Sequence, residues 1–404
     1  MRRIIIFPAL LLFCTIIIAG FRTDLTAPAN KPVSLLAPPE GGTKPTPNLI
    51  SFKSEINPPS GGQGGSSGRQ PDVGINPIRI GLLIQNSSSV EAKNGAELAI
   101  LTANNQGGYN GRKFELIVKS MEGPWGTGSK QAVDMIFNDG VVAIVGSHDG
   151  RNAHLVEQAT TKANITFLSA WSGDPTLSQA FTPWFFNSVP NDNQQAEILL
   201  NELKKKDFKK IVVFADDDYD ANSTLKCFLR KSTERGFLMP DIIKTSKSEK
   251  DLSGIAETIM KKSPDCLLLF TGQELAVKFL DELKKIKINI PVYGPMSLLG
   301  ESSPINNYPE VSKNILLLTS GDWYQKNKSG FAEDYHEKFG SYPGAAAAYG
   351  YDAMMIMIKA VKTAGAEKDK VHKALMETSY NGVTGVIKFD KKGNRVYTVV
   401  GTEL

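Results

Sequence analysis

From residue 78 onward the chain repeats one pattern, a short uninterrupted run of apolar residues followed by a segment with helical amphipathic periodicity. The repeat recurs at intervals of roughly 25–30 residues, about the length of one strand, one helix and their connections. Apolar runs without polar alternation are typical of strands that are buried on both faces of a parallel sheet. The pattern restarts near residue 191. We therefore predict a doubly wound α/β fold built as two units.

The pattern also predicts the individual elements. We expect strands at 78–85, 114–121, 141–146, 165–170, 211–215, 266–270 and 292–295. We expect helices at 92–105, 130–138, 152–163, 195–205, 223–235, 252–262 and 274–285. The C-terminal part differs, with a strand at 315–318, helices at 345–364 and 371–378, and antiparallel strands at 385–390 and 396–400.

The first 77 residues have a different composition. Met1-Arg2-Arg3 precedes 18 residues without a charge, 4–21. A basic start and an apolar run predict that residues 1–27 are a secretory signal peptide, with an uncleaved membrane anchor as the alternative. Residues 28–77 contain ten prolines and eight glycines, which predicts a disordered Pro/Gly-rich linker.

Charge and cysteine content exclude some classes of protein. Residues 78–404 hold 39 of the 46 basic and 38 of the 42 acidic side chains. This nearly neutral body gives no electrostatic reason to expect a nucleic-acid partner. The three cysteines do not make a disulfide framework. We interpret Cys227 and Cys266 as buried free thiols, with a bridge between them as the alternative.

Ligands of open α/β sheets bind beyond the carboxyl ends of the strands. The segments that follow the predicted strands are rich in hydroxyls, glycines and aromatic residues. Such segments suit a cleft that binds a small polar molecule through hydrogen bonds. They are 85–89, 122–124, 147–151, 170–173, 216–219, 271–273 and 296–297.

No catalytic, metal or cofactor motif is complete. The turn at Ser147-His148-Asp149 lies where a hydrolase nucleophile would stand, but its central residue is a histidine. His148, Asp149 and His154 lack a fourth metal ligand, so we interpret the two histidines as solvent-exposed or hydrogen-bonded. No dinucleotide-binding glycine motif follows a strand. We interpret the acidic run 216–218 as a loop that caps the next helix, with a divalent-ion site as the alternative. We therefore expect no cofactor, no metal and no enzyme activity.

Ten segments, spread in order along residues 78–404, carry a resemblance to a known family. They are Ile78–Gly81, Asn94–Ala99, Asn105–Arg112, Lys130–Val133, Val145-Gly146, Phe186–Pro190, Tyr351–Ala353, Tyr380–Gly385, Ile387–Asp390 and Gly393-Asn394. In order and spacing they resemble the type I periplasmic binding proteins, specifically the branched-chain amino-acid (Leu/Ile/Val) receptors of ABC transporters.

The resemblance implies two lobes joined by three crossovers, near 190–192, 319–323 and 381–385. One lobe would comprise 78–190 plus 322–380, and the other 191–321 plus 381–404. The lobes would close around a solute by hinge motion. The implied protein is a periplasmic or extracytoplasmic monomer that delivers a small-molecule ligand to an ABC permease. A tethered sensor that signals to a membrane receptor partner is the alternative, and the long linker favours it.

The resemblance also implies which residues bind the solute. They are Ser147, Asp149, Gly150, Ala170, Trp171, Ser172, Tyr219, Thr271, Gly272 and Met296. Trp171 and Tyr219, together with Trp323, are candidate stacking surfaces for a less polar or cyclic solute.

Several of these positions depart from the family pattern, among them the loops at 149–151 and 171–173. Gly272 stands where relatives place a tyrosine, and Met296 stands where they place the acid that pairs with the ligand ammonium. A buried ammonium without a counter-charge is costly. We therefore expect weak or no binding of leucine, isoleucine and valine, unless a carboxylate at Asp149, Asp218 or Asp322 substitutes for the missing acid.

Overall fold

The computed structural model describes residues 76–146, 150–180, 182–237, 239–287, 290–299 and 330–396. The chain divides into two compact units, 1–70 and 71–404, and every described residue belongs to the second. The predicted signal or anchor at 1–27 lies outside the described residues, as does all of the predicted linker up to residue 75. Among the described helices, none combines the length and the apolar character needed to cross a membrane.

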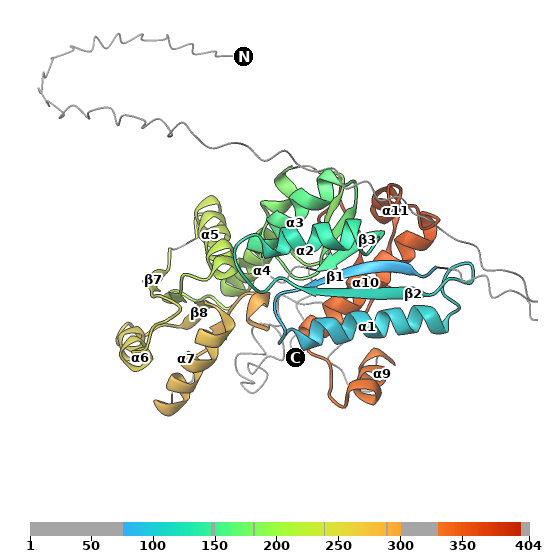
Figure 1. Cartoon of the computed structure of the whole chain (residues 1–404). Helices are drawn as coiled ribbons and strands as arrows, with labels where there is room; N and C mark the ends of the chain where they lie inside the picture. Colours follow the sequence, from blue (N-terminus) through green and yellow to red (C-terminus); the bar gives the residue numbers. More distant parts are fainter. Residues whose placement is uncertain are drawn as a thin grey trace, which may run out of the picture. The chain divides into compact units, whose positions relative to one another are not determined.

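The first half of the described body forms a parallel sheet of five strands (Figure 1). The strands are β1 (Ile78–Ile84), β2 (Phe114–Ser120), β3 (Ala143–Gly146), β4 (Thr166–Ser169) and β5 (Phe185–Asn187), in the order β2-β1-β3-β4-β5. Helix α1 (Val90–Asn105) packs with Ile80 and Leu82 on one face. Helices α2 (Thr127–Phe137) and α3 (Gly150–Lys162) pack with Leu83 and Ile144 on the other. Because helices cover both faces, the strands are continuous apolar runs.

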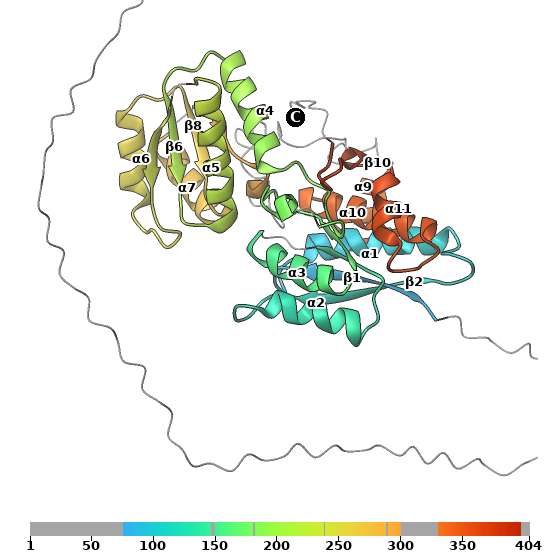
Figure 2. The same ribbon diagram turned by 90° about the horizontal axis from the view of Figure 1, so that it is seen from above.

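A second parallel sheet follows, and each sheet is flanked by its own helices (Figure 2). Its strands are β6 (Ile211–Ala215), β7 (Asp241–Lys244), β8 (Cys266–Phe270) and β9 (Val292–Tyr293), in the order β7-β6-β8-β9. Its helices are α4 (Asp192–Lys205), α5 (Tyr219–Glu234), α6 (Leu252–Lys261) and α7 (Gln273–Lys285). Cys227 on α5 and Cys266 on β8 are buried and free, which confirms their interpretation as free thiols.

Helix α10 (Ala345–Thr363) completes the core of the first sheet, although it lies far away in the sequence. It packs along α1 and also contacts β3 and β4. The two helices approach so closely that position 95 requires a glycine, because a Cβ on Gly95 would lie 2.1 Å from the carbonyl oxygen of Ala347. Helices α9 (Gly330–Phe339) and α11 (Val371–Glu377) precede and follow α10.

The C-terminal hairpin also packs on the first sheet. Strands β10 (Tyr380–Gly382) and β11 (Gly385–Ile387) pair antiparallel, and Phe389 then pairs antiparallel with Arg395. Ile387 and Phe389 lie in the core of the first sheet, with the Phe389 ring centroid 5.1 Å from that of Phe186. This packing differs from our assignment of 381–404 to the second lobe, because apolar side chains of that segment are buried against the first sheet. The other lobe boundaries stay a prediction.

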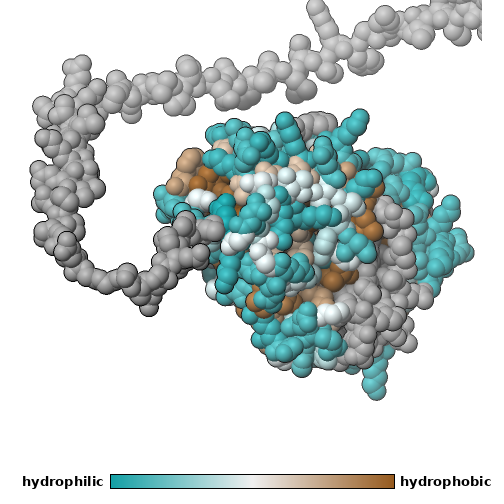
Figure 3. Space-filling model, turned by 90° about the vertical axis from the view of Figure 1, so that its right-hand side faces the viewer, coloured by the Kyte–Doolittle hydropathy of each residue, from teal (hydrophilic) through white to brown (hydrophobic). Residues whose placement is uncertain are grey.

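The exposed surface carries only scattered large apolar side chains. The face in Figure 3 is mainly hydrophilic, and its hydrophobic residues gather in small patches. Trp125 and Phe137 are the most exposed large apolar side chains among the described residues. Single exposed apolar residues of this kind are normal on globular proteins.

The prediction of a doubly wound α/β fold with two parallel sheets is confirmed. The strands at 211–215 and 266–270 agree residue for residue. The sequence analysis missed β5, which is only three residues long, and β7, an edge strand with mostly exposed residues that lacks an apolar run. It also missed α9. The strand predicted at 315–318 lies outside the described residues, as do positions 397–400 of the last predicted strand.

Candidate functional site

The loop after β4 is buried and anchored to its neighbours. Ala170, Trp171 and Ser172 are all buried, and the Trp171 ring packs edge-on against Tyr349 of α10 at 5.8 Å between centroids. The Ser172 carbonyl accepts a hydrogen bond of 2.7 Å from Nδ2 of Asn187. This loop therefore presents small polar groups on a rigid base, while the Trp171 ring packs on the core.

The loops after β6 and β8 are joined by a carboxylate. Asp216 accepts hydrogen bonds from the backbone N–H of Gly272 at 2.9 Å and of Asp218 at 3.0 Å. The Asp218 side chain accepts from the N–H of Ala221 and caps α5, which confirms the interpretation of this acidic run as a helix cap. Thr271, which is 1% exposed, lies beside this junction, and its hydroxyl oxygen has no hydrogen-bond partner among the described residues.

Met296 follows β9 in a short 3-10 helix, Met296–Leu299. It is 1% exposed, and its N–H donates to Oε1 of Gln195 at 2.9 Å. The amide nitrogen of the same glutamine donates to the carbonyl of Pro190 at 3.1 Å. The Met296 side chain is thus buried, and its backbone is linked through Gln195 to Pro190 on the connection between the two sheets.

A cleft of about 710 Å³ opens between the beginnings of α3 and α5. Its lining is polar and carries both positive and negative side chains, and it includes Tyr219, one of the predicted site residues. The lining residues are Gln85, Arg151, Asn152, Asp174, Pro175, Thr176, Asp217, Asp218, Tyr219, Asp220, Asn222, Ser223, Lys226, Cys227 and Lys247. Clefts of this size accommodate small organic molecules.

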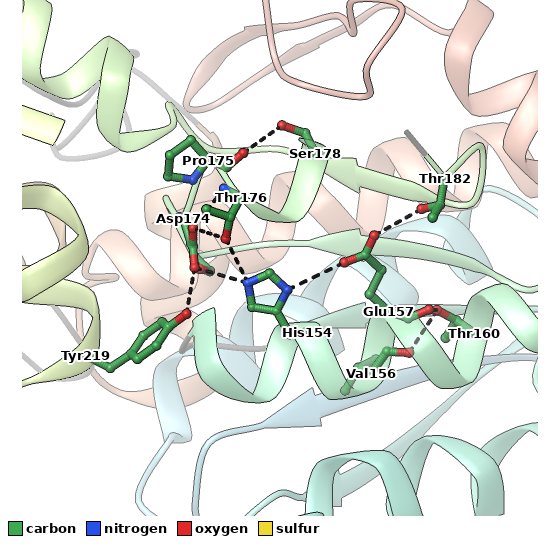
Figure 4. Close-up of polar contacts among 11 residues, drawn as sticks. His154, Val156, Glu157, Thr160, Asp174, Pro175, Thr176, Ser178, Thr182 and Tyr219 are labelled. Carbon is green, nitrogen blue, oxygen red and sulfur yellow. Dashed lines mark hydrogen bonds and ion pairs between the residues drawn. The ribbon is translucent and has the colours of Figure 1, made fainter. Parts of the chain in front are cut away.

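Asp174 is the centre of a hydrogen-bond network in the cleft wall (Figure 4). One carboxylate oxygen accepts from the N–H and the hydroxyl of Thr176, at 2.8 and 2.6 Å. The other accepts from the phenol of Tyr219 at 2.9 Å and lies 3.2 Å from Nε2 of His154. Burial alone would raise the pKa of Asp174, but the hydrogen bonds from His154, Thr176 and Tyr219 outweigh it and lower the pKa to about 2.

The neighbouring titratable groups respond to the same network. The hydrogen bond to Asp174 raises the pKa of His154. Burial raises the pKa of Glu157, whose carboxylate lies 3.9 Å from Nδ1 of His154 and accepts from the hydroxyl of Thr182 at 3.1 Å. His154 is therefore oriented by acids on both sides of its ring. No group of three or more His, Cys, Asp or Glu side chains among the described residues is arranged to hold a metal ion.

The predicted site residues are only partly brought together. Tyr219 lines the cleft, and the N–H of Gly150 at the start of α3 donates to Oδ1 of Asp220 at 2.9 Å. Ser147 and Asp149, like Asp322 and Trp323, lie outside the described residues. The remaining predicted residues belong to strand-end loops but do not line this cleft.

Sequence reasoning missed Asp174 and Asp220. Asp174 lies one residue beyond the strand-end segment 170–173, and Asp220 lies one residue beyond the segment 216–219. Extending each segment by one helical turn would have found both. The prediction that His154 is solvent-exposed or hydrogen-bonded is confirmed, but its partner Asp174, 20 residues away, leaves no local signal in the sequence.

Comparison with known proteins gives one family. Residues 77–400 match the family described as "Periplasmic binding protein". The leucine-, isoleucine-, valine-, threonine- and alanine-binding protein of Pseudomonas aeruginosa is 21% identical over 308 residues, which cover 74% of this chain and 81% of that protein. Glutamate receptor 3.7 of Arabidopsis thaliana is 25% identical over 165 residues, 40% of this chain. The match spans only 18% of the length of that receptor.

Solved structures agree with this fold. The branched-chain amino acid transporter substrate-binding protein LivJ of Streptococcus pneumoniae, in complex with isoleucine, superposes with a TM-score of 0.67 at 21% identity, over 79% of this chain and 93% of that one. A solute-binding protein of an ABC transporter from R. palustris, in complex with benzoate, reaches a TM-score of 0.67 at 17% identity, over 79% and 91%.

Proposed function

Because this chain belongs to the periplasmic binding protein family, a family of binding proteins and not of enzymes, we propose that it is an extracytoplasmic solute receptor. It captures a small polar solute, such as an amino acid, an amide or a related compound, and presents it to an ABC-type permease. The observation that supports this best is the polar cleft at the carboxyl ends of the strands, where open α/β sheets bind their ligands.

The buried hydroxyl of Thr271 supports a binding role for the loop after β8. A buried polar group without a hydrogen-bond partner is costly, and a polar atom of a bound solute would remove that cost. The proposed solute-binding set is the one that the family resemblance implies. It comprises Ser147, Asp149, Gly150, Ala170, Trp171, Ser172, Tyr219, Thr271, Gly272 and Met296.

A thermal-shift screen of the full chain tests this function. L-isoleucine, L-asparagine and benzoate serve as probes for an aliphatic amino acid, an amide and an aromatic acid. A ligand present at 100 times its dissociation constant adds about 2.7 kcal/mol to the free energy of unfolding. A concentration-dependent rise in melting temperature with one class supports the proposal. Melting temperatures that stay constant across all amino acids, amides and aromatic acids would contradict it.

Met296 makes the selectivity testable. Losing one charge-assisted partner in a desolvated cleft costs roughly 2–5 kcal/mol, or about 30-fold to several thousand-fold in affinity. We therefore expect titration calorimetry to find weak or no binding of leucine, and binding that depends on Asp149 if this residue substitutes for the acid. Sub-micromolar leucine binding that persists in Asp149→Asn would refute both the selectivity and the substitution.

A tethered sensor is the second candidate function. It is favoured by the 165-residue match to a plant glutamate receptor and by the Pro/Gly-rich composition of residues 28–77. Genes for a permease and an ATPase beside this one would favour transport, whereas a neighbouring kinase or cyclase gene would favour sensing.

A further inference from the structure

Two consecutive residues at the start of α5 bond to the loops of the first sheet. The phenol of Tyr219 donates to the carboxylate of Asp174 at 2.9 Å, while the carboxylate of Asp220 accepts from the N–H of Gly150 at 2.9 Å. The two bonds are reciprocal, because each side supplies one donor and one carboxylate. They join segments that are 45 and 70 residues apart in the chain.

Both acceptors suit such a contact. Asp174 is buried and is held ionised by its other partners, Thr176 and His154. Hydrogen bonds to an ionised acceptor are roughly twice as strong as those between neutral groups. Asp220 lies opposite the first N–H of α3, where the helix dipole favours a negative charge. Each bond is therefore stronger than a bond between neutral surface groups.

The contact is also accessible to solvent. Tyr219 is 43% exposed, and Tyr219 and Asp220 both line the cleft. Water can replace either bond when the two loops separate. A contact of this strength and exposure biases an equilibrium between open and closed states without locking it.

We propose that Tyr219 and Asp220 form a latch, which holds the loops of the second sheet against those of the first sheet and so keeps the cleft closed. Both are positioning residues, since they act through Asp174 and Gly150. Resting on the proposed solute-receptor function, the latch would slow the release of bound solute. It also gives Tyr219 a role through its hydroxyl, beside the stacking role that the sequence analysis assigned to its ring.

Hydrogen exchange of the Gly150 amide in the ligand-free full chain tests the latch. Tyr219→Phe removes one hydroxyl and leaves the Gly150–Asp220 bond in place. If the two bonds open together, this variant accelerates exchange at Gly150 about two- to tenfold, the equivalent of one net hydrogen bond. Tyr342→Phe, the same change at another exposed tyrosine, serves as the control and leaves exchange at Gly150 unchanged.

A second comparison tests whether the two hydrogen bonds of the latch open together or independently. Asp220→Ala removes the acceptor, and the double variant with Tyr219→Phe exchanges at Gly150 no faster than Asp220→Ala alone if the latch opens as a unit. Asp334→Ala on α9 is the matched control for the lost carboxylate. Unchanged Gly150 exchange in Tyr219→Phe, or rates that multiply independently in the double variant, would overturn the latch. The test needs no solute, so a ligand screen that fails contradicts the proposed function and leaves the latch result standing.

Discussion

Two of the described regions that connect the first sheet with the second are built very differently. On one side, the chain passes from β5 to α4 beside the C-terminal hairpin, and we call this region the crossover brace (residues 187–195 and 383–396, with Asp352). On the other side, the proposed latch consists of Gly150, Asp174, Tyr219 and Asp220. The brace is centred on the buried, hydrogen-bonded side chains of Arg395 and Asp352, whereas the latch bonds of Tyr219 and Asp220 lie at the cleft, where Tyr219 is 43% exposed.

Arg395 is the centre of the brace. Its side chain is 1% exposed and donates to the carbonyls of Ser188 at 2.9 Å, Thr384 at 2.7 Å and Val386 at 3.2 Å. The first of these partners lies 207 residues away, on the connection to the second sheet. A buried guanidinium whose three nitrogens all donate hydrogen bonds cannot exchange these partners for water without a large cost.

Asp352 on α10 binds the hairpin segment of the brace through hydrogen bonds. Its buried carboxylate accepts from the N–H groups of Val383 at 3.0 Å and Thr384 at 2.7 Å. Burial raises the pKa of Asp352 to about 6, although these hydrogen bonds and the charge of Arg395 act in the opposite direction. The difference between the two regions indicates that the loops at the cleft separate more easily than the brace does.

Arg395→Met gives the largest expected effect. It leaves the carbonyl groups of Ser188, Thr384 and Val386 without this donor, the first two of them in buried hydrogen bonds, and removes a buried charge near Asp352. We expect the free energy of unfolding, measured by urea denaturation, to fall by about 3–5 kcal/mol. The control is Arg235→Met on the surface, where the arginine pairs with Glu197 and the expected loss is below about 1 kcal/mol. Equal losses of unfolding free energy in Arg395→Met and Arg235→Met would show that the arginine of the brace stabilises the fold no more than a surface arginine does.

Asp192, in the first turn of α4 within the brace, is expected to make the free energy of unfolding depend on pH. Its complete burial raises the pKa to about 7, although Ser223 and Thr224 donate to it. A carboxyl whose pKa is raised on folding stabilises the fold most at low pH, and that contribution is lost as the pH rises towards the folded pKa. Asp192→Asn lacks this titration. We therefore expect the variant to gain about 2–3 kcal/mol relative to the wild type between pH 5 and pH 8.

Urea unfolding of both proteins at the two pH values measures this difference, in which the other titrating groups cancel. The matched control is Asp334→Asn, an exposed aspartate on α9, which should show no such change. A difference between Asp192→Asn and wild type that is the same at pH 5 and pH 8 would show that Asp192 ionises normally in the folded protein.

Tyr219→Phe gives a smaller effect on stability. One partly exposed hydrogen bond is lost, so we expect the free energy of unfolding to fall by only about 0.5–1.5 kcal/mol. Urea denaturation beside Arg395→Met checks this directly. A loss from Tyr219→Phe that equals the loss from Arg395→Met would mean that the cleft edge is as firmly held as the brace.

His154→Gln gives the smallest effect, and only its direction is expected. Asp174 raises the pKa of His154, so the histidine stabilises the fold below its ordinary pKa, and that contribution is lost as the pH rises through the folded value. The variant should therefore lose part of the pH dependence of stability above the ordinary pKa of histidine. Unfolding curves of the variant and the wild type that shift in parallel with pH would contradict this.

The apolar pattern predicted most of the elements because burial acts residue by residue. Runs such as 211–215 and 266–270 are apolar throughout, and only a covered sheet accommodates them. Helix ends were predicted less well. Helix α4 begins at Asp192, three residues before the predicted start, because Asn191 and Gln194 form a capping box that apolar periodicity does not detect.

The sequence by itself determined the α/β class and the two parallel sheets, since these follow from local burial and from chain direction. Only the tertiary structure decided that Ile387 and Phe389 pack on the first sheet. It also decided that Arg395 donates a hydrogen bond to the carbonyl of Ser188 and that Tyr219 donates one to Asp174. Each of these contacts joins residues that are distant in the sequence. Their bonds depend on directions and distances that form only when the separate elements have packed, and no local pattern of residue types records them.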